Sequence, residues 1–164
     1  MGPFTDEAVS LAGIRRGLLV ILLLGMAGMA IELLLLDHFE DTTQLIPLGL
    51  LAVGVAVVAW NALGGGRGSV LVVQIVMVLF VAAGFAGAYF HYRANVDFQR
   101  EIDPTLGGAA LLWATLRAKT PPALAPGMMV QLGLIGLAYA YRQPARSRGD
   151  ALEEDRLEEN RDES

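Results

Sequence analysis

Cysteine is absent from this chain of 164 residues, and histidine occurs only twice, at His38 and His91. Without cysteine the protein can form no disulfide bond, no thiolate metal site and no cysteine nucleophile, and the redox compartment stays undetermined. The sequence also lacks HExxH, Gly-x-Ser-x-Gly and dinucleotide-binding motifs. These absences remove the familiar sequence signatures of several large enzyme classes, which favours a non-catalytic protein over an enzyme but leaves the question open.

Charged residues are scarce and unevenly placed. They make up 18% of the chain against 54% hydrophobic residues, and the mean hydropathy is +0.50, which is typical of a membrane protein. The net charge is -5, and segment 143–164 accounts for -4 of it because it holds eight acidic residues against four arginines. We expect this segment to be a charged, disordered cytoplasmic tail. Nothing in the chain resembles the basic patch of a nucleic-acid-binding surface.

Long apolar runs dominate the rest of the sequence. Four of them are long enough to cross roughly 30 Å of hydrocarbon as helices, at about 17–36, 45–63, 70–92 and 122–142. Between the last two, Asp103-Pro104 and the helical spacing that follows predict a short helix near 104–118. This helix is expected to lie on the membrane surface, or alternatively to cover the bundle mouth as a lid. The predicted fold is therefore all-α: a four-helix transmembrane bundle with one short interfacial amphipathic helix between the third and fourth spans.

Basic residues predict the orientation of this bundle. Six of them fall on one side, in the leader 1–16, in the glycine-rich turn 64–69 and after the fourth span, whereas four fall on the other side. By the positive-inside rule this bias places both termini in the cytoplasm of a multi-pass protein in the cell membrane. The glycine-rich turn has neither the preceding strand nor the Gly-Lys-Ser/Thr ending of a phosphate-binding loop, so we interpret it as a flexible connection.

Small residues recur on one face of three spans. Because lipid offers no hydrophobic drive for helix association, positions that let two backbones approach closely are the expected contacts. They are Gly25 and Gly28, Gly84 and Gly87, and Gly133 and Gly136. Glu32 shares the glycine face of the first span, so we expect it to point at neighbouring helices rather than at lipid.

Polar residues are concentrated where the first and third spans are expected to reach the outer membrane face. The candidates for a polar or metal-binding site are Glu32, His38, His91, Tyr92, Asn95 and Glu101. Imidazole and carboxylate groups can together bind a divalent metal or move protons. Haem is disfavoured because His38 and Glu32 lie about 120° apart around their helix. Ordinary interfacial polarity explains the same residues, so no cofactor is assigned, but we expect Glu32 and His91 to be neighbours that hold each other charged.

Two functions fit this architecture. In the first, the protein is a non-catalytic accessory or assembly component of a membrane complex, embedded in the lipid bilayer and packed against a partner membrane protein or further copies of itself. In the second, the outer Glu/His cluster handles a metal ion or protons in transport or redox chemistry. We favour the first, because four short helices enclose little volume for a substrate path.

Overall fold

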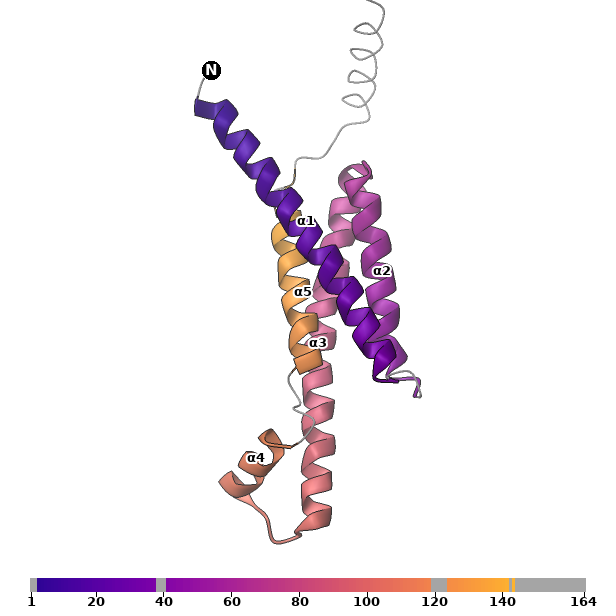
Figure 1. Ribbon diagram of the computed structural model, residues 1–164, viewed down its shortest axis with the longest axis vertical. Coiled ribbons are helices and arrows are strands. Elements are labelled where there is room, and N and C mark those ends of the chain that lie inside the picture. The colour runs from indigo at the N-terminus through magenta and orange to yellow at the C-terminus, as the bar shows by residue number, and fades with distance from the viewer. Residues whose placement is uncertain (1–2, 38–40, 119–123, 142, 144–164) are drawn as a thin grey trace, which may run out of the picture.

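The computed structural model describes residues 3–37, 41–118, 124–141 and 143, and this part of the chain is helical, with five helices and no strand (Figure 1). The all-α class predicted from the sequence is therefore confirmed. Three of the apolar runs correspond to α1, α2 and α3, and α5 covers most of the fourth. In chain order the helices are α1 (Pro3–Leu35), α2 (Leu45–Ala62), α3 (Gly66–Ile102), α4 (Gly108–Leu116) and α5 (Leu124–Ala140).

Three of these helices contain segments long and apolar enough to cross a membrane, at Leu11–Leu35, Leu45–Ala62 and Gly68–Ile102. The membrane character of the protein follows from them. The helix α5 is also apolar but has only 17 residues, or about 25 Å at 1.5 Å per residue.

The helices α1, α2, α3 and α5 run alternately in opposite directions (Figure 1). The helix α5 packs against α3 and α1, and α2 also packs against α3 and α1. Consequently α1 and α3 occupy opposite corners of the bundle and make little direct contact. Two ends can be distinguished: the Asn61 end, where α2 turns into α3, and the His91 end, where α1 stops while α3 continues to Ile102.

The centre of the bundle is built around the fully buried Phe80 of α3. Its ring lies over Gly54 of α2, where an added Cβ atom would come within 2.8 Å of Phe80 Cζ and 3.2 Å of Met26 Cε. Gly54 therefore leaves the space that a phenyl ring from α3 and a methionine from α1 share. The sequence pattern did not identify this position.

The closest helix pair is α3 with α5, and glycine accounts for the proximity. A Cβ atom at Gly84 would lie 2.7 Å from the carbonyl oxygen of Pro126 and 2.9 Å from the amide nitrogen of Val130. A Cβ atom at Gly133 would lie 2.7 Å from the carbonyl oxygen of Met77. Since these neighbours are backbone atoms, they cannot move aside as a side chain could. Gly136 faces the thioether of the same methionine, whereas Gly87 has only ordinary contacts, beginning at 3.4 Å from Pro126 Cγ.

The packed face of α1 differs from the expected glycine face. Gly25 does touch α5, since a Cβ atom there would lie 2.6 Å from Leu132 Cδ2, but Gly28 has nothing within 4 Å and Glu32 is exposed. The expectation that Glu32 points at other helices of this chain is therefore wrong. The buried stripe lies roughly 110° further around the helix at 100° per residue, and it consists of Leu22, Met26, Met29 and Leu33.

The first helix also begins earlier than expected. It starts at Pro3, so the expected leader 1–16 is helical from residue 3 onward. Proline is favourable in the first turn of a helix, and no second proline interrupts residues 4–35. The expected tail 143–164 lies outside the described residues apart from Gln143.

The short helix α4 begins at Gly108 rather than at Pro104, and Asp103 caps the end of α3 instead of the start of α4. The Asp103 N–H donates to the carbonyl oxygen of Gln99, while its carboxylate accepts the Thr105 N–H at 2.9 Å and the Thr105 hydroxyl at 2.6 Å. These hydrogen bonds hold the pKa of Asp103 below its ordinary value. The side chain therefore closes a turn, and α4 packs beside the extension of α3 (Figure 1).

The α3–α5 contact predicts a sharp difference between two neighbouring glycines. Gly84→Ala forces a methyl group against backbone atoms and should lower the free energy of unfolding by about 1–3 kcal/mol, whereas Gly87→Ala should change it by less than about 0.5 kcal/mol. Thermal unfolding in detergent would measure both, with Gly28→Ala as a control at an open position. Equal destabilisation by all three changes would show that α3 and α5 are not in this close contact.

Candidate functional site

The structure separates most of the polar residues that the sequence singled out. His91 is exposed, while Tyr92 and Asn95 are half-buried on the following turn of α3. Glu101 is exposed in the last turn of the same helix, ten residues or about 15 Å beyond His91. Glu32 is exposed on α1, at the opposite corner of the bundle. His38 lies outside the described residues.

These positions bear on the metal-site hypothesis. In residues 3–37, 41–118 and 124–141, no three His, Asp or Glu side chains lie close enough together to hold a metal ion. His38 and Glu40 fall in the gap between the first two of these ranges. The metal or proton site therefore stays a prediction, and the structure draws attention to a different feature beside His91.

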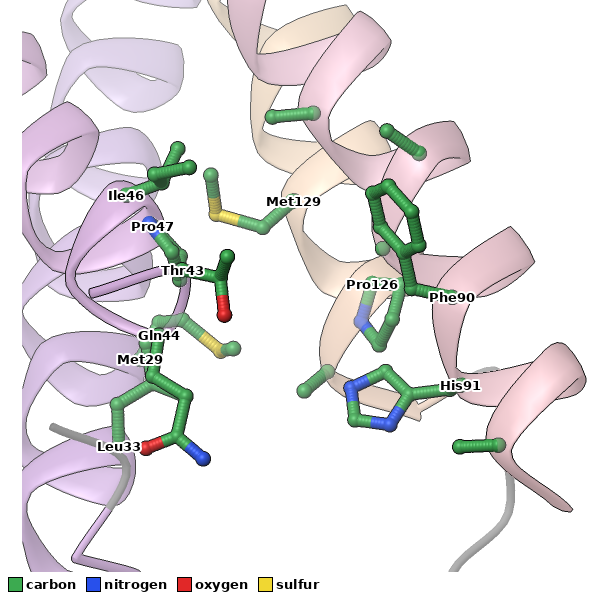
Figure 2. Close-up of a pocket in the computed structure, with 15 residues that line it drawn as sticks. Met29, Leu33, Thr43, Gln44, Ile46, Pro47, Phe90, His91, Pro126 and Met129 are labelled. Atoms are coloured by element: carbon green, nitrogen blue, oxygen red, sulfur yellow. The ribbon is translucent and has the colours of Figure 1, made fainter. Parts of the chain in front are cut away.

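A pocket of about 430 Å³ opens at the His91 end, between the start of α2 and the middle of α3 (Figure 2). One wall is formed by α1 and α2, the other by α3 and α5. Figure 2 shows Met29 and Met129 facing the pocket from these opposite walls. The first wall consists of Met29, Leu33, Thr43, Gln44, Ile46 and Pro47, and the second includes Phe90, His91, Pro126 and Met129.

Local backbone features explain why the pocket forms here. A turn precedes α2, in which the Gln44 N–H donates to the carbonyl oxygen of Asp41 at 2.9 Å. The Asp41 N–H donates in return to Gln44 Oε1 at 3.2 Å, which holds this side chain beside the pocket. On the far wall, Pro126 lies in the first turn of α5, where its missing N–H removes no intrahelical hydrogen bond. Ala83, Ala86 and Gly87 contribute little side-chain volume on α3, so space remains between the walls.

Polar side chains meet at one part of the pocket. In Figure 2, Gln44 and His91 extend into the same space from opposite walls, with Thr43 beside Gln44. Among the described residues that line the pocket, these three carry the polar side chains and none is Asp, Glu, Lys or Arg. These side chains can offer hydrogen bonds to a ligand, and the described part of the lining contributes no carboxylate or arginine charge.

Sequence reasoning missed a second polar group at the opposite end of the bundle. Asn61 Nδ2 donates to Ser69 Oγ at 2.8 Å, and the Tyr139 hydroxyl donates to Asn61 Oδ1 at 2.7 Å. All three residues are buried. The Ser69 hydroxyl donates in turn to the carbonyl oxygen of Gly66 at 2.8 Å. This network, which we call the Asn61 network, ties α2, α3 and α5 together.

Two further side chains extend the Asn61 network toward the surface. The side chains of Gln143 and of Arg15 on α1 both lie near the Tyr139 hydroxyl, and Gln143 Oε1 is buried without a hydrogen-bond partner among the described residues. Arg15 also donates to the carbonyl oxygen of Tyr141 at 3.4 Å. All four long helices therefore contribute to this end. The sequence signal was the polar pair Asn61 and Ser69, of which Ser69 belongs to the glycine-rich turn that we interpreted as a flexible connection.

The two ends of the bundle should differ in energetic coupling. Tyr139→Phe and Asn61→Leu each break the same buried hydrogen bond, so the double change should lose less stability than the sum of the single changes, by about 0.6–1.7 kcal/mol. Thermal or denaturant unfolding in detergent would measure this difference.

A matched control uses the pair that the sequence had coupled. Glu32 and His91 lie on opposite corners of the bundle, so the losses caused by Glu32→Gln and His91→Gln should add within about 0.5 kcal/mol. Additive losses at Asn61 and Tyr139 would contradict the hydrogen-bonded network, and coupling between Glu32 and His91 would contradict the arrangement of α1 and α3.

Comparison with known proteins adds no relative: no protein-family model matches the chain, and neither the curated proteins nor the solved structures provide a significant match.

Proposed function

We propose that this chain is a four-span integral membrane protein of the cell membrane, with both termini in the cytoplasm, and that it serves as a non-catalytic accessory component of a membrane complex. The single observation that carries the functional part is an unfilled packing face on α1 that includes an exposed carboxylate. The geometry of α5 supports the four-span part.

The helix α5 lies alongside the part of α3 that is apolar enough to cross a membrane. Gly133 contacts α3 at Met77, and Gly84 contacts α5 at Pro126 and Val130. Because these contacts fall inside the segment Gly68–Ile102, α5 occupies the same layer as α3 and crosses it in the opposite direction. Its length of about 25 Å is somewhat short of the hydrocarbon thickness, and such a mismatch is tolerated at modest cost.

We further propose that α4 lies at the membrane surface. Trp113 and Leu116 are 62% and 49% exposed, which would be unfavourable in water but suits the headgroup region. The guanidinium carbon of Arg117 lies 5.6 Å from the centre of the Trp113 ring, an arrangement that pairs a cation with an aromatic ring at the boundary. The helix packs on the extension of α3 rather than across the bundle mouth, which favours the surface position over a lid.

The topology can be tested directly because the chain has no native cysteine. A cysteine at Gly68, which is exposed with open space around it, should react with a membrane-impermeant maleimide only after the membrane is permeabilised. A cysteine at the exposed Thr42 should react in intact cells. The reverse pattern would place the termini outside, and equal labelling of both sites in intact cells would contradict an odd number of crossings between them.

The accessory role follows from α1. The positions of Gly17 and Gly28 have nothing within 4 Å of an added Cβ atom, and Glu32 on the same face is exposed. A carboxylate against hydrocarbon is unfavourable by about 2.5 kcal/mol or more near the bilayer centre and by less toward the helix end. A partner helix that packs on the glycines and donates a hydrogen bond to Glu32 would remove that penalty. The face is therefore suited to a transmembrane helix of another subunit.

A photoreactive amino acid at Gly28 would test this role in native membranes. Irradiation should link the chain to one discrete partner polypeptide, because that face would be covered by a protein helix. The same amino acid at Val78, which is 54% exposed on α3, serves as a lipid-facing control and should yield only lipid adducts. Lipid adducts alone at both positions would reject the accessory role. A cross-linked product that contains only copies of this chain would show that the face binds another copy of the chain and not a different subunit.

A further inference from the structure

The pocket at the His91 end has the properties of a binding site that the accessory role does not require. We infer that it binds one membrane amphiphile per chain, with an apolar tail between the two walls and a head whose carbonyl or ester oxygens accept hydrogen bonds from His91, Gln44 and Thr43. Binding in this pocket does not depend on whether α1 meets a partner helix.

The volume and the deep lining suit an apolar tail. About 430 Å³ lies within the range of roughly 300–1,000 Å³ that is usual for small-molecule sites. Met29 and Leu33 form part of one wall, and Met129 forms part of the other, and each of these three side chains is at most 5% exposed. Methionine side chains are flexible and polarisable, so they can adjust to the shape of a chain or ring between them. Burial of apolar ligand surface here would be favourable.

The polar side chains define the head. Gln44 and His91 approach from opposite walls (Figure 2), and the amide, imidazole and Thr43 hydroxyl can all donate hydrogen bonds. A head that accepts hydrogen bonds on two sides matches this arrangement. The lining residues that the structure describes include no carboxylate, lysine or arginine, so none of them offers a fixed opposite charge to a cationic or strongly anionic head. A neutral head with oxygen acceptors is the best match.

The position of the pocket indicates that such a molecule would come from the membrane. The polar side chains lie where α1 ends and α2 begins, whereas the methionines lie one or more turns further into the bundle. A ligand that entered would therefore keep its head near the membrane boundary and its tail at hydrocarbon depth. Acylglycerol lipids and short-ring quinones share this chemistry, and the experiment must separate them.

The test uses the purified full-length chain in lipid nanodiscs, with equilibrium dialysis for affinity and native mass spectrometry for stoichiometry. The probes are a medium-chain monoacylglycerol, a short-tailed benzoquinone and, as a reference without oxygen, an alkylbenzene. We expect at least one oxygen-bearing probe to bind saturably with one molecule per chain. The probe that binds more tightly identifies the source of the natural ligand.

Three variants assign this binding to the pocket. Ala86→Phe places a ring in the lining and should weaken binding of the oxygen-bearing probe by about tenfold or more. The matched control is Ala82→Phe, one turn earlier on α3, exposed and outside the lining, and it should leave affinity unchanged. His91→Leu should weaken binding of the oxygen-bearing probe several-fold and leave binding of the alkylbenzene unchanged. If Ala86→Phe does not fold, Ala94→Phe at an exposed lining position replaces it.

Each result decides the inference. Saturable binding that Ala86→Phe and His91→Leu weaken, with Ala82→Phe unchanged, supports it. Absence of saturable binding for both oxygen-bearing probes overturns it, and so does an equal loss of affinity in Ala82→Phe and Ala86→Phe. If His91→Leu affects no probe, or affects all three equally, the proposed recognition of the head is overturned.

Discussion

The close approach of α3 and α5 is the constraint on which the rest of the bundle depends. Lipid tails are as apolar as leucine, so helices in a membrane associate through tight van der Waals packing and interhelical hydrogen bonds. Gly84 and Gly133 bring the two backbones into direct contact. This contact aligns α5, the shortest of the four bundle helices, with α3, the longest. The helix α1 then packs on α5 through Gly25 and Leu132, while α2 packs on α3 where Gly54 accommodates Phe80.

This packing distributes the polar side chains differently at the two ends. At the Asn61 end, the hydrogen bonds from Tyr139 to Asn61 and from Asn61 to Ser69 join three helices through buried side chains. At the His91 end, α1 and α2 face α3 and α5 across a pocket. Gln44 and His91 extend into that space from opposite walls (Figure 2), and Gln44 also accepts a hydrogen bond from the Asp41 N–H. Buried hydrogen bonds between helices therefore hold one end of the bundle together, whereas a pocket separates the helices at the other end.

Much of the helical content was predictable from the sequence, because an apolar run as long as Val70–Tyr89 can satisfy its backbone hydrogen bonds within a membrane only as a helix or in a closed barrel. The orientation of α1 was not. Its residues are apolar on all sides between Gly17 and Leu36 apart from Glu32, so no polar face indicated which side packs, and the single carboxylate pointed to the wrong one. The Asn61 network was missed for another reason: its three members lie on three helices, and only the tertiary arrangement brings Tyr139 to Asn61.

The length of α3 explains why the candidate pocket lies where it does. The helix has 37 residues, about 55 Å at 1.5 Å per residue, which exceeds the roughly 30 Å of hydrocarbon. The helix α1 ends at Leu35 and α2 begins at Leu45, so both stop where α3 continues, and His91 falls at this level. Polar side chains at a membrane boundary can exchange hydrogen bonds with water, while the methionines deeper in the pocket cannot. A molecule that satisfies both parts of the pocket must therefore itself be amphiphilic.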